Sequence, residues 1–187
     1  MQETTSKLVL DEERLRLGSD QVDRVLKGIF KAVGFPEDIS KAVSSHLIDS
    51  SLVGVESHGV MRILEYVAQV KSGYLNIAGR PNLLKNGKNF LEVSANGGIG
   101  IPAFNLAYNE CCNDAELKGL SIMAIKNVGH TGRLGAYAED AGNKGFLTIC
   151  MGGGNRQTWR QVAPHGGAKG MLPTNPWCIG IPGGQSG

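Results

Sequence analysis

The stretch Ser57–Tyr66 reads SHGVMRILEY and places four chemically capable side chains within ten residues. If the chain is helical from about Gly59, then His58, Arg62 and Tyr66 lie at steps of four and form one stripe. Such a helix buries its apolar face and presents an imidazole, a guanidinium and a phenol on the other. An ordinary helix with a solvated polar face has the same pattern, so both interpretations stay open. The apolar stripe consists of Val60, Ile63, Leu64 and Val67.

Further helical patterns around this stretch predict an N-terminal helical unit over residues 1–75. Apolar residues recur at helical spacing after Ser19, a good N-cap, and Gly34 is placed to end that helix. Pro36 is suited to the first position of a second helix. The helix of the opening stretch comes third, and Gly73 caps it.

The second part of the chain, residues 76–187, alternates strand and helix patterns. The dipeptide Asn86-Gly87 between two apolar runs is a hairpin signal. The apolar runs 120–125 and 146–151 predict two buried strands. This alternation predicts an α/β layered domain with a mixed sheet, because a hairpin occurs beside parallel pairing. The other expected elements are strands at 83–84, 90–93 and 177–181, and helices from about Pro102 to Gly119 and from about Arg133 to Lys144.

Composition narrows the classes of function. The 187 residues are 41% hydrophobic and 19% charged, and the net charge of +2 gives no electrostatic reason to expect nucleic acid or an anionic membrane as partner. The N-terminus has no apolar run that could serve as a signal peptide or membrane span, so a cytoplasmic protein is expected. The four cysteines show no paired-ligand spacing, and no metal site is expected. His46 also lacks a partner at ligand spacing and is interpreted as a structural or surface residue.

One glycine-rich segment fits a known cofactor motif and is set aside. Residues 98–103 match G-x-G-x-x-A between a strand and a helix, as the Rossmann dinucleotide fingerprint requires. The next strand, however, leads into Lys126 and Asn127, where that fingerprint needs an acidic residue for the ribose. The preceding element is also a hairpin arm. A tight turn into a helix is therefore the preferred interpretation.

A second candidate site surrounds His130. The turn from Asn127 to Leu134 lies between a strand and a helix, where α/β proteins bind ligands and where backbone N–H groups meet phosphates. A connecting turn with a surface histidine is the alternative. The segments 162–167 and 174–176 are interpreted as rigid loops.

Together these motifs resemble the type 2 malate/L-lactate dehydrogenase family, which includes ureidoglycolate, sulfolactate and diketogulonate enzymes and reductases of cyclic imino acids. The likeness extends from about residue 18 to the end, with the motifs in the same order. It implies hydride transfer between NADH or NADPH and a 2-oxo acid, a related imine or the 2-hydroxy acid. It also implies a fold distinct from the Rossmann fold, and a homodimer. The motifs are Ser57-His58-Gly59-Val60 with Arg62 and Tyr66, Asn127 to His130 with Gly132 and Leu134, Val162-Ala163-Pro164 with Gly166-Gly167, and Thr174-Asn175-Pro176.

The resemblance also implies roles for individual residues. His58 would be the general acid that protonates the substrate, oriented by Ser57. Arg62 would hold the substrate carboxylate, and Tyr66 would close the pocket. His130 would lie near the nicotinamide as a possible second acid. The residues that would bind NAD or NADP are His130, Thr131, Gly132, Arg133, Leu134, Thr174, Asn175 and Pro176, with Leu134 also facing the substrate.

The end of the chain departs from the family pattern. Family members are roughly twice as long, and the sequence here stops at Gly187, just before the segment in which the family carries an aspartate that completes the serine–histidine relay. The chain is therefore expected to be an N-terminal portion of such an enzyme. A truncated, non-catalytic binding or dimerisation module is the alternative. A serine or cysteine hydrolase is poorly supported, because the sequence has no G-x-S-x-G motif.

Overall fold

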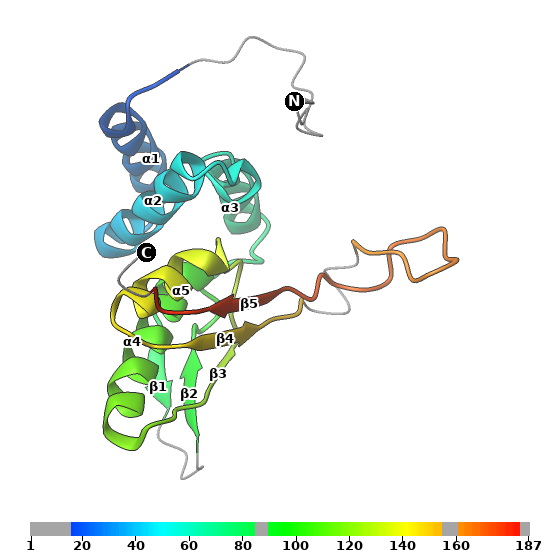
Figure 1. The fold of residues 1–187 in the computed structure, drawn as a ribbon. Coiled ribbons are helices and arrows are strands. Elements are labelled where there is room, and N and C mark those ends of the chain that lie inside the picture. The colour runs from blue at the N-terminus through cyan, green and yellow to red at the C-terminus, as the bar shows by residue number, and fades with distance from the viewer. Residues whose placement is uncertain (1–15, 85–89, 155–160, 184–187) are drawn as a thin grey trace, which may run out of the picture.

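The computed structural model describes residues 16–84, 90–154 and 161–183. Three helices come first, and strands and helices then alternate (Figure 1). The elements are α1 (Ser19–Val33), α2 (Glu37–Leu52), the 3₁₀ turn η1 (Glu56–His58), α3 (Arg62–Lys71), β1 (Asn82–Leu84), β2 (Leu91–Ser94), α4 (Gly100–Lys118), β3 (Met123–Lys126), α5 (Leu134–Asn143), β4 (Thr148–Met151) and β5 (Trp177–Gly180).

The first two helices confirm the sequence prediction, with small differences at their starts. Gly34 ends α1 with φ 97°, a left-handed conformation that glycine adopts without strain. Gly18 rather than Ser19 is the N-cap of α1. Pro36 precedes α2, because its extended ψ of 146° places it outside the helix.

The chain around the opening motif differs from the predicted single helix. Gly59 is extended and buried, and a Cβ there would lie 2.1 Å from Ser51 Oγ on α2. This close approach separates η1 from α3, so His58 lies outside the helix. Tyr66 is fully buried instead of lying on an exposed stripe, whereas Leu64 is 72% exposed. The predicted division into polar and apolar stripes was therefore wrong at these two positions.

One hydrophobic core joins the helices to the α/β part. The side chains of Phe30, Val43, Leu47 and Tyr66 are fully buried within it. Ile101 at the start of α4 belongs to the same cluster. The helices and the α/β part thus share apolar burial, and the division into 1–75 and 76–187 stays a prediction.

The strands form a mixed sheet, as predicted. β1 is antiparallel to β2, and β2 is parallel to β3 with α4 as the connection. The predicted turn at Asn86-Gly87 lies outside the described residues. β4 and β5 form a separate antiparallel pair.

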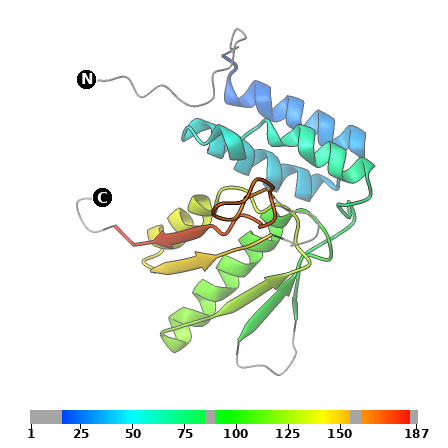
Figure 2. The same ribbon diagram turned by 90° about the vertical axis from the view of Figure 1, so that its right-hand side faces the viewer.

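Among the described residues, helices cover the strands on one face only (Figures 1 and 2). α4 packs against β2 and β3, α5 packs against β4 and β5, and the two helices touch. Strands β3 and β4 therefore alternate between half-buried and exposed residues. The prediction that both are buried strands was wrong, since Ile149 is 58% and Met151 61% exposed.

The glycine-rich turn before α4 is filled by neighbouring backbone. A Cβ at Gly98 would lie 2.5 Å from the carbonyl oxygen of Gly79, and one at Gly100 would lie 2.6 Å from that of Gly129. These glycines are needed for close packing of chain segments, which agrees with a tight turn rather than a Rossmann phosphate site.

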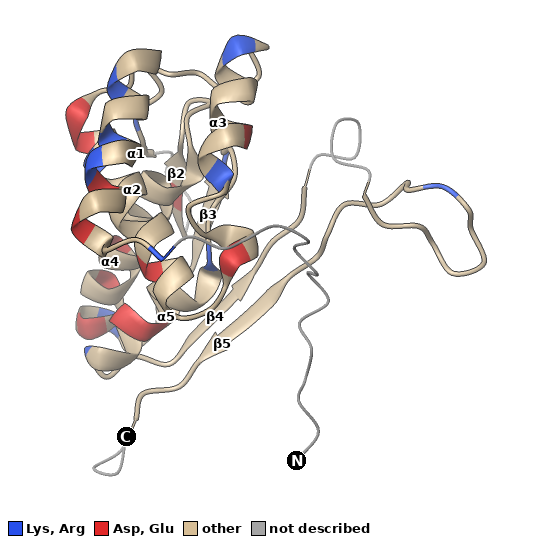
Figure 3. Ribbon diagram, turned by 90° about the horizontal axis from the view of Figure 1, so that it is seen from above, with Lys and Arg blue, Asp and Glu red and all other residues tan. Residues whose placement is uncertain are grey.

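Charged residues are concentrated on the helices, whereas the β4–β5 ribbon carries none (Figure 3). Among the described helices, none is both long and apolar enough to cross a bilayer.

Candidate active site

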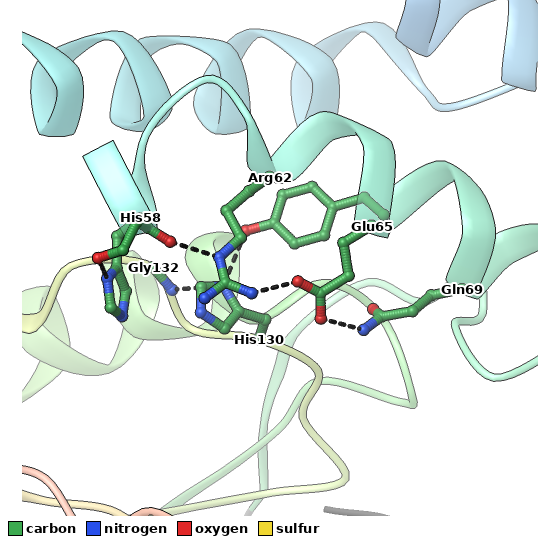
Figure 4. Close-up of polar contacts among 8 residues, drawn as sticks. His58, Arg62, Glu65, Gln69, His130 and Gly132 are labelled. Carbon is green, nitrogen blue, oxygen red and sulfur yellow. Dashed lines mark hydrogen bonds and ion pairs between the residues drawn. The ribbon is translucent and has the colours of Figure 1, made fainter. Parts of the chain in front are cut away.

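The opening motif meets the loop between β3 and α5 at a cluster of two histidines and a tyrosine (Figure 4). The ring centroids of His58 and His130 are 5.3 Å apart. Tyr66 Oη lies 2.8 Å from His130 Nδ1. The fold thus brings together residues from two sequence motifs that the chain separates by more than sixty positions.

Two donors converge on Nδ1 of His130: the Tyr66 hydroxyl, and the Gly132 N–H at 3.3 Å. A backbone N–H only donates, so Nδ1 carries a lone pair and the neutral ring has its proton on Nε2. Burial raises the pKa of Tyr66 far above its ordinary value, which keeps its hydroxyl protonated. Burial, and then the charge of Arg62, lowers the pKa of His130 to about 3.

His58 has a matching arrangement. Ser57 Oγ lies 3.0 Å from its Nδ1. Burial, followed by the charge of Arg62, lowers the pKa of His58 below its ordinary value. Each imidazole therefore has a hydroxyl at Nδ1, and neither Nε2 has a hydrogen-bond partner in the described part of the chain. Both Nε2 atoms are available to a ligand.

Arg62 begins α3 and is held on two sides. Its Nε donates to the Ser57 carbonyl oxygen at 2.6 Å, and its Nη1 forms an ion pair with Glu65. Gln69 in turn donates to Glu65 at 2.9 Å. Within the described ranges Nη2 of Arg62 has no partner. The guanidinium is thus fixed near both histidines with one nitrogen left to bind an anion.

The loop of His130 is fastened at several points. Thr131 accepts a hydrogen bond at its carbonyl oxygen from the Tyr137 hydroxyl at 2.6 Å. Arg133 is the N-cap of α5, and its side chain, 11% exposed, pairs with Asp49 and Glu139. Its guanidinium is directed to these carboxylates and does not line the neighbouring groove.

That groove has a volume of about 1390 Å³. His130 belongs to its lining, so the histidine cluster and the groove are continuous. Side chains of α4, β3 and β4 complete the wall. Neither His58, Arg62 nor Asn175 lines it. Among the residues expected to bind the cofactor, those that line the groove are His130, Thr131, Leu134, Thr174 and Pro176.

Sequence reasoning missed three residues that touch the site. Glu65 pairs with Arg62, Tyr137 holds the loop, and His46 accepts a hydrogen bond from the Arg133 N–H at 2.8 Å. Only Glu65 had a local signal, its i, i+3 spacing from Arg62. His46 and Arg133 are 87 positions apart, and no sequence pattern joins them.

The described residues contain no group of three potential metal-binding side chains. All four cysteines are free thiols.

Comparison with known proteins gives a consistent result. A family model described as malate/L-lactate dehydrogenase matches residues 17–187. Malate dehydrogenase of Pyrococcus abyssi is 31% identical over 173 residues, 92% of this chain and 47% of that protein. L-sulfolactate dehydrogenase of Methanocaldococcus jannaschii is 27% identical over 160 residues, 86% of this chain and 45% of that protein.

Solved structures share the fold. Malate dehydrogenase from Pyrococcus horikoshii OT3 matches with a TM-score of 0.79 and 28% identity, covering 90% of this chain and 47% of that one. The chain spans about half the length of the curated relatives it matches. With a family match across nearly all of its residues and the same fold, the chain belongs to the malate/L-lactate dehydrogenase family.

Proposed function

We propose that this chain carries the substrate side of an oxidoreductase that transfers a hydride between NADH or NADPH and a 2-oxo acid or its 2-hydroxy acid. The observation that carries the proposal is the pair of imidazoles, His58 and His130, beside the fixed guanidinium of Arg62 and next to a large groove. Relatives named as malate, sulfolactate and imino acid enzymes support the substrate class.

His58 is the proposed general acid. Its Nδ1 is engaged by Ser57, so a protonated ring presents its Nε2–H to the substrate oxygen. Burial, and then the charge of Arg62, lowers the pKa of His58 below its ordinary value. A substrate carboxylate bound to Arg62 offsets that charge, and so it removes the part of the lowering of the His58 pKa that Arg62 causes. Substrate binding thus favours the protonated form that the reaction needs.

Three further residues complete the proposed substrate pocket. Arg62 holds the carboxylate through its guanidinium. Its Nη2 is available for this contact, because it has no protein partner among the described residues. Tyr66 closes the pocket and, through its hydroxyl, fixes the His130 ring. Leu134 lies at the start of α5 and supplies apolar surface.

The groove is larger than the several hundred cubic ångströms of an ordinary small-molecule pocket, which supports the proposal that it takes a dinucleotide; NAD or NADP would supply the hydride. His130 is proposed as a neutral hydrogen-bond donor beside the nicotinamide, because its low pKa disfavours the protonated ring. The residues proposed to hold the cofactor are Thr131, Gly132, Arg133, Leu134, Thr174, Asn175 and Pro176. For Arg133 that role is confined to its backbone, since its side chain is occupied by Asp49 and Glu139.

The setting proposed for this reaction is the cytoplasm, without a metal ion. Four free cysteines support a reducing compartment.

The test is direct. The purified chain is titrated with NADH and NADPH, and oxidation of each is followed at neutral pH against a panel of 2-oxo acids and cyclic imines. We expect binding of at least one dinucleotide and turnover with at least one substrate. H58Q should lower kcat by about 100-fold or more, the usual contribution of a general acid, while the exposed-histidine variant H165Q leaves kcat unchanged. A chain that bound neither dinucleotide and oxidised neither would refute the proposal.

A non-catalytic assembly module is the second candidate, and one surface favours it. Ile149 and Ile179 are cross-strand partners, as are Met151 and Trp177, and all four are more than half exposed. By their strand register they share one face of the β4–β5 pair, whose strands contain no charged residue. A second copy of the chain is the proposed occupant. Light scattering would then show a dimer that I179K dissociates, and cofactor titration would show no binding.

A further inference from the structure

His46 lies inside α2, 87 positions before Arg133 in the sequence, yet it contacts the loop of His130. Its side chain is almost completely buried, with the residue only 8% exposed. The imidazole stacks on the ring of Tyr137, with centroids 5.2 Å apart and planes inclined by 26°. The groups whose charges act on it are Arg133, Asp49 and His58. Burial of a polar ring at this place calls for a specific partner.

The partner is the backbone of Arg133. The Arg133 N–H donates to Nε2 of His46 at 2.8 Å. Nε2 therefore carries a lone pair, and the ring is neutral with its proton on Nδ1. Burial, and then the charge of the Arg133 side chain, lowers the pKa of His46 to about 4, so the acceptor state holds throughout the neutral range.

The next residue back along the loop is in direct contact with the same nitrogen. Gly132 is buried with φ 71°, and a Cβ there would lie 2.2 Å from His46 Nε2. The loop backbone at Gly132 therefore packs closely against the imidazole. The N–H of Gly132 donates to Nδ1 of His130. Two consecutive backbone N–H groups thus connect the two rings, one bonded to His46 and the other to His130.

We propose that His46 is a positioning residue: by accepting the Arg133 N–H and packing on Gly132, it holds the loop so that His130 faces His58 and Tyr66. This role is distinct from any contact with substrate or cofactor. Its consequence for turnover rests on the proposed function, whereas its consequence for the loop does not.

The experiment compares three substitutions of His46 in the full 187-residue chain. H46Q keeps an acceptor at about the reach of Nε2. The side chain in H46N is too short to reach the Arg133 N–H, and H46L removes the acceptor. Amide hydrogen exchange reports on the Arg133 N–H, and the imidazole ¹⁵N shifts report on Nδ1 of His130. We expect H46L and H46N to speed exchange at Arg133 about tenfold and to move the His130 shifts, while H46Q restores both.

D49N is the matched control, because it removes the charge of one side-chain partner of Arg133 and leaves the contact with His46 in place. It should change neither readout. If H46L does not fold, the H46N and H46Q pair decides. Unchanged Arg133 exchange and His130 shifts in H46N would overturn the proposal, and so would a D49N effect equal to that of H46N.

Turnover separates this inference from the proposed function. If the wild-type chain is active, H46N should lower kcat more than it raises the KM for the 2-oxo acid, and H46Q should recover most of kcat. An H46N kcat equal to wild type would overturn the positioning role while leaving the proposed function intact. If the wild-type chain is inactive, the proposed function fails and the two NMR readouts decide on the positioning role by themselves.

Discussion

The Tyr66 hydroxyl lies 2.8 Å from Nδ1 of His130 and joins two residues that are 64 positions apart. Tyr66 is fully buried, so its ring is part of the core while its hydroxyl reaches the histidine cluster. The same residue thus connects the packing of the helices to the orientation of a proposed active-site ring. Both effects are testable, because phenylalanine preserves the packing and removes the hydrogen bond.

Y66F should lower the free energy of unfolding by about 1 kcal/mol, the usual net value of one hydrogen bond. Loss of one of the two donors at Nδ1 should also change the ¹⁵N shifts of His130. Urea titration and NMR measure the two effects. Y74F, at a tyrosine that is 47% exposed, is the control and should change neither. Unaltered His130 shifts in Y66F would contradict the assigned bond.

Gly132→Ala should be costly for two separable reasons. Its φ of 71° strains any residue with a Cβ, and the new methyl would clash with His46. We expect a loss of about 3 kcal/mol in the free energy of unfolding, falling to about 1 kcal/mol when H46A is the background. G54A has a similar φ of 80° with open space around it, so it measures the strain alone. Additive effects of G132A and H46A would contradict the contact.

The features that sequence predicted well are local. The end of α1 at Gly34 follows from one residue that tolerates a positive φ, and the β1–β2 pairing follows from a turn between two apolar runs. The order of helices and strands follows from such signals. Burial was predicted less well, because the apolar runs at β3 and β4 suggested two covered faces where helices cover only one.

The candidate site was predictable only in part, because some of its contacts join residues that are distant in sequence. His58 and Arg62 are near neighbours in sequence, so their proximity follows from spacing. The contacts of His130 with Tyr66, and of His46 with Arg133, form only when distant segments pack. Family resemblance suggested that the first pair belongs to one pocket, but no signal pointed to His46. Without knowledge of its partner, the Arg133 N–H, a histidine inside a helix is interpreted as structural.

Acidification should destabilise the fold through His46. Its folded-state pKa, about 4, is below the ordinary 6.5, so the unfolded chain binds a proton that the folded chain does not. The stability contributed by neutral His46 is complete above pH 6.5 and is lost as the pH falls toward 4. The total is about 3 kcal/mol.

Urea unfolding between pH 7 and pH 4 tests this dependence. H46Q should flatten the slope by up to about 1.4 kcal/mol per pH unit, the value for one proton. H165Q, which replaces an exposed histidine, controls for the loss of a histidine as such. An H46Q slope identical to that of wild type would show that His46 does not carry the acid sensitivity.

Arg62→Lys should weaken substrate binding if the guanidinium holds a carboxylate. Lysine keeps the charge but loses the planar fork, so KM for the 2-oxo acid should rise about 10- to 100-fold. Steady-state kinetics measure this change. R80K is the matched control, since Arg80 forms an exposed ion pair with Asp38. An unchanged KM in R62K would argue against a carboxylate at Arg62.

Arg62→Gln tests the electrostatic part of the same site without requiring turnover. Burial and the charge of Arg62 together hold the pKa of both His58 and His130 below the ordinary value. Removing the charge should therefore raise both pKa values. Burial should still keep both below the ordinary value of a histidine. NMR titration of the imidazole resonances follows the shift. R62K is the control, because it retains the positive charge and should leave the titrations close to wild type. Equal titrations in R62Q and wild type would show that the charge of Arg62 does not control the protonation of these rings.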